Sequence, residues 1–191
     1  MRVPSPPPPL HVPRSVGHAA LAELDRVPWG RLAHAYGVGR SGEGLHHDVA
    51  ATLRGLGDDD PEMFEDAANT VFSNLCHQGT IYEATPFAVP FLAAFAAGVD
   101  LADEQVASFV AMFVLIGVAA TYDAPDGSHS GSFGPGVGAA VLAAFRESEA
   151  HLSAMGVRNP GLAPVARAVS AVAAHEPPDA DAVRTLQSLL P

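Results

Sequence analysis

The 191-residue chain has the length of one domain, and its hydrophobic content of 48% is enough for a sizeable core. Its ten basic residues are all arginine and stand against 21 acidic residues, which gives a formal net charge of −11. This balance repels a phosphate backbone, so we expect no nucleic-acid partner, and instead a protein partner, preferably basic, or a small molecule.

The first 16 residues form a proline-rich arm, with six prolines between Met1 and Pro13. Proline lacks a backbone donor and restricts the residue before it, so this arm cannot be helical and is expected to adopt polyproline II geometry. Two alternatives remain for it: a disordered extension, or an arm that lies over the domain or reaches a neighbouring subunit. Residues 17–191 are expected to form one domain.

Apolar periodicity predicts eight or nine helices in the remainder of the chain. They are expected over residues 17–24, 28–36, 45–56, 61–75, 88–95, 103–122, 137–155, 160–175 and 179–190. The run of three aspartates before Pro61 predicts an acidic N-cap with proline in the first turn. No segment alternates with a period of two, so we predict no strand. The fold class is therefore all-α, either a superhelix or a compact stack of antiparallel helix pairs.

The most apolar segment, Val106–Ala120, is shorter than the roughly 18 residues that span a bilayer. We therefore expect a buried helix there.

The N-terminus has no apolar run of the kind found in a secretory signal. Cys76 is the only cysteine, which excludes an internal disulfide and favours a reducing compartment. Together these features predict a cytoplasmic protein without membrane contact.

A polar joint separates two of the predicted helices, over residues 74–86. It is longer than the usual helix connection of about 2–8 residues and denser in hydrogen-bonding side chains. In one interpretation these side chains only brace the helix ends, with His77, Gln78 and Thr80 closing one helix and Thr85 capping the next. In the other, Tyr82 and Glu83 face a groove and contact a ligand or a partner.

The joint belongs to a set of motifs that resembles bacterial HEAT-like repeat proteins. The resemblance covers residues 29–95, about a third of the chain, and its His-Gln-Gly-Thr joint is fairly specific. It implies an armadillo-type stack of helices that binds proteins, in some cases as the immunity partner of a toxin. The motifs are Trp29-x-x-Leu32-x-His34-Ala35-Tyr36-Gly37, Asp48-Val49, His77-Gln78-Gly79-Thr80-x-Tyr82-x-Ala84-Thr85 and Ala88-Val89-Pro90-Phe91-Leu92.

Other chemistry has weaker support in the sequence. His34 and Tyr36 would meet His77 if neighbouring helix pairs stack, and an imidazole beside a carboxylate is the minimum for acid–base catalysis. His46 and His47 are adjacent and diverge on a helix, so they are a poor metal chelate. Cys76 follows a buried helical face and is expected to be an inert apolar residue. We expect no metal or other cofactor.

Two functions of different classes follow from these features. The first is a non-enzymatic binding protein that uses a face or groove of the helical stack. The second is a small-molecule-binding protein or enzyme, with an enclosed site built from segments 29–47, 77–85 and 123–136. The candidate ligand- or partner-binding residues are Trp29, His34, Tyr36, His77, Gln78, Thr80, Tyr82 and Glu83.

Overall fold

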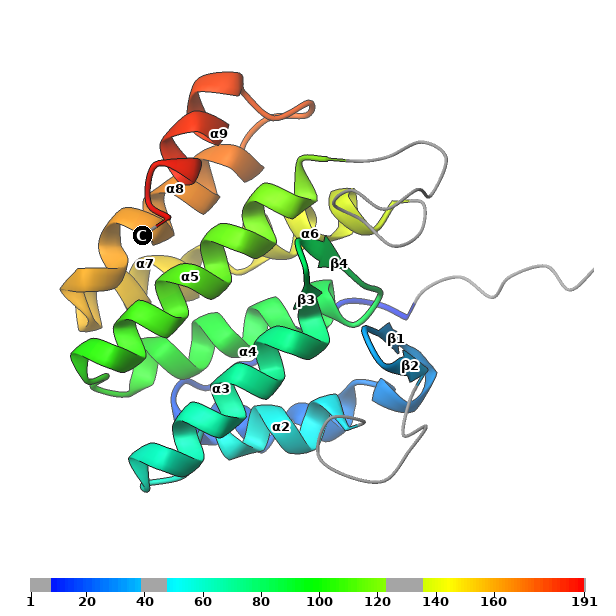
Figure 1. The fold of residues 1–191 in the computed structure, drawn as a ribbon, viewed down its shortest axis with the longest axis vertical. Helices are drawn as coiled ribbons and strands as arrows, with labels where there is room; N and C mark the ends of the chain where they lie inside the picture. The colour runs from blue at the N-terminus through cyan, green and yellow to red at the C-terminus, as the bar shows by residue number, and fades with distance from the viewer. Residues whose placement is uncertain (1–7, 39–47, 123–135, 191) are drawn as a thin grey trace, which may run out of the picture.

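The computed structural model describes residues 8–38, 48–122 and 136–190. Its helices are α1 His18–Leu21, α2 Val49–Gly55, α3 Pro61–Leu75, α4 Thr85–Gly98, α5 Asp103–Ala120, α6 Val137–Glu147, α7 Glu149–Arg158, α8 Ala163–Ala173 and α9 Ala180–Gln187. Short 3₁₀ turns occupy η1 Leu24–Arg26, η2 Trp29–Arg31 and η4 Pro160–Leu162. The protein is mostly helical, as predicted, and its helices pack around one apolar core (Figure 1).

Helices α4 and α5 lie between the early part of the chain, α2 and α3, and the late part, α8 and α9 (Figure 1). Every residue of α4 from Thr85 to Ala96 is buried, because α1, α6 and α7 cover it. A helix that is apolar on all sides belongs to the interior. The helix starts at Thr85, three residues before the predicted start, so Pro90 lies inside it and cannot donate to the carbonyl of Pro86.

Helix α5 has 18 residues and a mean hydropathy of 1.6, so by length and composition it could cross a membrane. Of its residues, 44% are buried inside the fold, against α3, α6, α8 and α9. Core helices of water-soluble proteins have the same length and composition. The predicted helix is confirmed as part of α5, which is longer than the apolar segment and is buried only in part.

Several helix starts follow directly from the sequence. Asp60 caps α3 by accepting from the backbone N–H of Glu62, and Pro61 occupies the first turn. Asp179 caps α9 in the same way, through the N–H groups of Asp181 and Ala182. A side-chain oxygen at this position satisfies donors that have no partner within the helix, and a carboxylate also interacts favourably with the helix dipole.

The predicted helix over residues 137–155 is wrong, because the chain breaks at Ser148 into α6 and α7. Both halves pack on α4 and α8, and α6 packs on α5 as well. Ser148 is fully buried at this break. Since serine is not a strong helix breaker, tertiary packing rather than local preference sets the break.

The prediction of no strands is also wrong, since the structure contains two small antiparallel hairpins. Strands β1 (Ala33–His34) and β2 (Gly37–Val38) form the first, and β3 (Cys76–His77) and β4 (Thr80–Ile81) form the second. The helix expected over residues 28–36 is not formed, because the 3₁₀ turn η2 occupies Trp29–Arg31 and the first hairpin begins at Ala33. Strands of two residues are too short to show a period of two, which explains why the sequence pattern did not reveal them.

The described part of the N-terminal arm lies over the domain, which was one of the two alternatives for it. Glu23 holds the arm to the domain through hydrogen bonds. One of its carboxylate oxygens accepts from the N–H of Arg14 at 3.0 Å and from the hydroxyl of Ser15 at 2.8 Å. The other oxygen accepts from the ring of His11 at 3.0 Å. Burial acts to raise the pKa of Glu23, but hydrogen bonds from Ser15, His11 and the backbone outweigh it and lower the pKa from 4.5 to about 2.

The arm is also tied to α4 and α7. The Nε2 of His151 in α7 donates to the carbonyl of Pro13 at 2.9 Å, and the N–H of Gly17 donates to the carbonyl of Ala94 at 2.8 Å. A Cβ atom on Gly98 would lie 2.2 Å from the nitrogen of Gly17. The close approach of the arm to the end of α4 therefore requires glycine at this position.

Candidate functional site

The two hairpins lie side by side at one end of the helices (Figure 1). Three hydrogen bonds join the first hairpin to residues that flank the second. The N–H of Ala35 donates to the carbonyl of Asn74 at 3.1 Å, and the N–H of Ala84 donates to the carbonyl of Ala33 at 2.9 Å. The carboxylate of Glu83 accepts from the N–H of Ala33 at 3.1 Å. We call residues 33–38 and 76–81 the paired hairpins.

Thr85 fixes the second hairpin to the helix before it. Its hydroxyl donates to the carbonyl of Leu75 at 2.7 Å and accepts from the N–H of Tyr82 at 3.0 Å. The predicted role of Thr85 as the cap of α4 is wrong, because the N-cap of that helix is Ala84, without a side-chain hydrogen bond. Thr85 instead satisfies a carbonyl at the C-terminal end of α3.

A tight turn forms the tip of the second hairpin. Gln78 and Gly79 both have positive φ, 51° and 78°, as a two-residue type I′ turn requires. This backbone matches the natural twist of two antiparallel strands, and glycine adopts it without strain. Both residues are exposed, so Gln78 extends outward at the tip, whereas Thr80 on the following strand is half-buried.

Aromatic rings from the two hairpins meet at their surface. The ring of Tyr36 lies edge-on to the ring of His77, with 5.8 Å between centroids and 61° between planes. The predicted meeting of these two residues is confirmed, although hairpins rather than stacked helix pairs bring them together. Tyr36 is 39% exposed. His34 lies beneath, buried, and its Nδ1 accepts from the N–H of Tyr36 at 3.3 Å.

Two weakly acidic side chains lie near these rings: Cys76, which is buried, and Tyr82, which is half-buried. Burial raises the pKa of the Cys76 thiol to about 12, although a backbone hydrogen bond from Gly79 partly offsets this. The thiol therefore stays protonated at neutral pH and is no nucleophile, as predicted for an inert residue. Burial also raises the pKa of the half-buried Tyr82, and Cys76 and Tyr36 add to the effect, so this phenol stays neutral.

Asn74 is a polar residue of the site that sequence reasoning missed. Its side chain is fully buried on α3, beneath the first hairpin, and within the described part of the chain neither amide atom makes a hydrogen bond. Burying an amide without a partner costs about 1–3 kcal/mol. The sequence signal was present, because an asparagine stands where the helical apolar stripe continues from Val71 to Leu75.

The remaining candidates have structural roles. Trp29 is buried, its Nε1 donates to the carbonyl of Leu24 at 2.8 Å, and its ring packs near Phe91. Glu83 is exposed, but its carboxylate joins the hairpins as described above. The segments 39–47 and 123–135, which belong to the proposed enclosed site, lie outside the described residues. Within residues 8–38, 48–122 and 136–190, no group of three His, Cys, Asp or Glu residues is placed to hold a metal ion.

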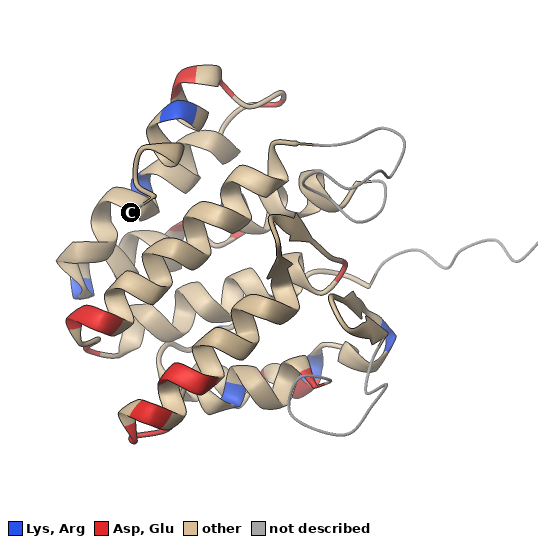
Figure 2. Ribbon diagram, in the orientation of Figure 1, with Lys and Arg blue, Asp and Glu red and all other residues tan. Residues whose placement is uncertain are grey.

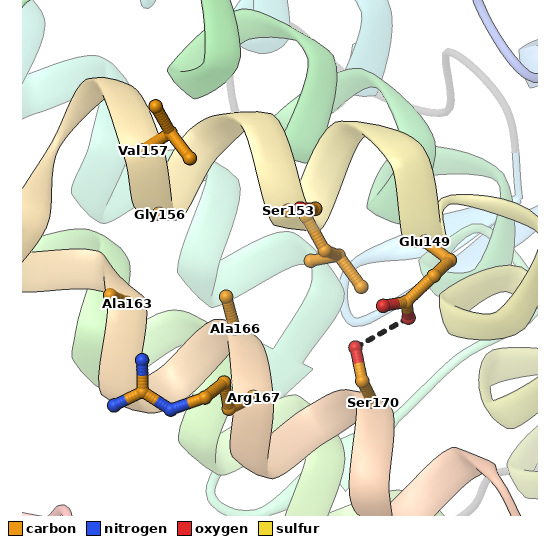
Figure 3. Close-up of a pocket in the computed structure, with 9 residues that line it drawn as sticks. Glu149, Ser153, Gly156, Val157, Ala163, Ala166, Arg167 and Ser170 are labelled. Carbon is orange, nitrogen blue, oxygen red and sulfur yellow. Dashed lines mark hydrogen bonds between the residues drawn. The ribbon is translucent and has the colours of Figure 1, made fainter.

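A groove of about 490 Å³ lies between α7 and α8. It is lined by Glu149, Leu152, Ser153, Gly156, Val157, Ala163, Ala166, Arg167 and Ser170 (Figure 3). None of the eight predicted site residues lines it, so this groove is a feature separate from the paired hairpins.

The acidic side chains are distributed unevenly. They gather at the N-terminal ends of α3 and α5, on the left of the view in Figure 2, and at the start of α9. The exposed acidic residues at the first two places are Asp58, Asp59, Asp60, Glu62, Glu65, Asp66, Asp100, Asp103 and Glu104. The paired hairpins lie at the C-terminal end of α3, so the acidic surface and the aromatic surface occupy different ends of the same helix.

No protein-family model matches the chain, and neither a curated protein nor a solved structure matches it.

Proposed function

We propose that this protein is a non-enzymatic binding protein that contacts a protein partner through the paired hairpins. The observation that carries the proposal is the exposed ring of Tyr36, held edge-on to His77 on two hydrogen-bonded hairpins. Rigid tyrosines lose little conformational entropy on binding and are enriched among the residues that dominate interface energies. Gln78 at the neighbouring turn supplies an adaptable polar contact.

The chemistry of the site favours binding over catalysis. A nucleophilic thiol requires a lowered pKa, whereas the pKa of Cys76 is raised to about 12. The carboxylate of Glu83 is engaged by the backbone of Ala33, and the Nδ1 of His34 by the backbone of Tyr36. Two of the groups that could transfer protons, Glu83 and the Nδ1 of His34, are therefore used to hold the hairpins in place.

The charge of the protein favours a basic partner. A net charge of −11 attracts basic proteins over distances set by ionic screening and accelerates their association. The acidic surface at the start of α3 and α5 would guide such a partner, while the aromatic rings at the other end of α3 would provide short-range contacts. We also propose a cytoplasmic location for this interaction, and a toxin-immunity role is one form that it takes in the HEAT-like proteins that the sequence resembles.

For the scaffold, we propose a HEAT-like stack in its compact form. Sequential helices pack in pairs, α2 with α3 and α7 with α8, as in helical repeats. Helix α4, however, packs against α6 and α7, which follow it by some 40 to 70 residues in the chain. In an open superhelix each unit contacts mainly its neighbours, so the buried α4 favours the compact stack of helix pairs.

Affinity capture from the source organism tests the proposal when three baits are compared. The wild-type protein should retain a partner, Tyr36→Ala should lose it by at least about tenfold, and Met63→Ala should retain it. Met63 is a matched control because it is also exposed, at 50%, but lies at the opposite end of α3. Equal recovery on all three baits would contradict binding through the paired hairpins.

A second candidate function is a small-molecule site, and the buried amide of Asn74 favours it. A side-chain amide presents a donor pair and an acceptor, which suit a ligand carrying an amide or a carboxylic acid. Native mass spectrometry of the freshly purified protein separates the two candidates. A retained small molecule that is lost in Asn74→Leu would support this second function, and an unliganded mass for both proteins would exclude a tightly bound ligand.

A further inference from the structure

The groove between α7 and α8 is lined largely by small residues, with the apolar side chain of Val157 exposed at its edge. A Cβ atom on Gly156 would lie 3.1 Å from the Cα of Ala163, so the two helices approach closely at this point. Ser153 and Ala166 continue the small surface along the groove (Figure 3). Val157 stands at the rim with 81% of its surface exposed, the largest value among the exposed large hydrophobic residues described. A helix from another molecule could therefore lie close to these small residues and cover Val157.

The groove carries one charge of each sign. Glu149 is contributed by α7 and Arg167 by α8 (Figure 3). The carboxylate of Glu149 accepts from the hydroxyl of Ser170 at 2.6 Å, which holds it across the groove. Arg167 is exposed and forms no ion pair with any described residue. A complementary occupant must offer a carboxylate to Arg167 and a cation to Glu149.

The part of the chain around the groove has no acidic excess. Residues 137–173, which span α6 to α8, contain three arginines and two glutamates. Residues 48–104, in contrast, contain eleven acidic residues and one arginine. A second copy of this chain is itself strongly acidic, so it meets less repulsion through the α6–α8 side than through the segment of residues 48–104.

We propose that a second copy of this chain occupies the groove, in a two-fold symmetric dimer. In such an interface every contact occurs twice, because residue i of one copy meets residue j of the other and the reverse. Arg167 of each copy then faces Glu149 of the other, and Val157 is buried on both sides. At the start of α5, next to this contact, the charge of Asp100 is compensated by its ion pair with Arg158 at 2.7 Å. The paired hairpins lie outside this interface, so a dimer would present two of them.

Charge reversal tests the dimer by sedimentation velocity and light scattering over a range of protein concentrations. The wild-type protein should show a reversible monomer–dimer equilibrium. Glu149→Arg and Arg167→Glu should each raise the dimer dissociation constant about tenfold or more, since each places like charges opposite each other twice. The double variant, with both charges exchanged, should restore the wild-type constant. Arg31→Glu is the matched control, because Arg31 is likewise exposed, pairs with no described residue and lies far from the groove in the sequence.

Three results would overturn the proposal. One is a wild-type protein that stays monomeric at every concentration, which would leave the groove to another occupant or to none. Another is a dimer that both single variants leave unchanged, which would place the interface on a different surface. The third is a double variant that folds, as shown by circular dichroism, but does not recover dimerisation. Val157→Asp should weaken the dimer without changing the charge pairing and provides an independent check.

Discussion

Replacing Glu23 by glutamine tests how the N-terminal arm is held to the domain. The carboxylate of Glu23 accepts hydrogen bonds from the backbone of Arg14, from the backbone and hydroxyl of Ser15 and from the ring of His11. Glutamine keeps the shape of the side chain and one acceptor oxygen, but loses the charge. Hydrogen bonds to a charged group contribute about 1.5–3 kcal/mol, so we expect Glu23→Gln to lower the free energy of unfolding by about 2 kcal/mol at neutral pH.

The stability difference between wild type and Glu23→Gln should depend on pH, because folding changes the pKa of Glu23. The pKa of Glu23 falls from 4.5 to about 2 in the folded protein. A lowered pKa in the folded state means that the stabilisation is fully present above pH 4.5 and is lost as the pH falls towards 2. The difference between wild type and Glu23→Gln should therefore be largest above pH 4.5 and should vanish near pH 2.

Urea denaturation at a series of pH values measures this difference, and hydrogen exchange of residues 8–17 shows whether the arm detaches. Glu147→Gln is the control, because Glu147 is exposed and accepts no hydrogen bond from a described side chain or loop. Its effect should stay within about 0.5 kcal/mol at every pH. Equal stability of Glu23→Gln and wild type at pH 7, with unchanged exchange of the arm, would refute the reasoning.

Three further predictions concern the paired hairpins. Thr85→Val keeps the side-chain volume but leaves a buried carbonyl of Leu75 without its donor, so thermal or urea unfolding should show a loss of about 1–3 kcal/mol. Gly79→Ala should cost about 1 kcal/mol by the same measurement, because φ is +78°, whereas Gly30→Ala, at a position with open space and no positive φ, should cost less. Cys76 should not react with a thiol reagent at pH 8 in the folded protein and should react once urea unfolds it; rapid reaction under native conditions would contradict its burial.

Features encoded by single residues could be predicted from the sequence. Asp60 with Pro61, and Asp179, define helix starts because a side-chain oxygen next to the first turn acts locally. The helical faces could also be predicted, since Phe64, Ala68 and Val71 recur at helical spacing and are buried. Local capping and periodicity thus account for the all-α class and for most of the helices.

Features set by contacts between distant segments could not be predicted. The break between α6 and α7 falls at Ser148, where no local breaker stands; both helices pack on α4 and α8, but only α6 also packs on α5. The brace formed by the carboxylate of Glu83 depends on Ala33, 50 residues earlier in the chain. In the site, the contact of Tyr36 with His77 was predicted from a helix stacking that does not form, and the two hairpins produce it instead.

The most direct test of the proposed binding function is a hydrogen–deuterium exchange footprint of this protein with the partner recovered by affinity capture. The account predicts that the partner slows exchange in residues 33–38 and 76–83 and leaves α7 and α8 unchanged. Slower exchange elsewhere, with the paired hairpins unaffected, would contradict it.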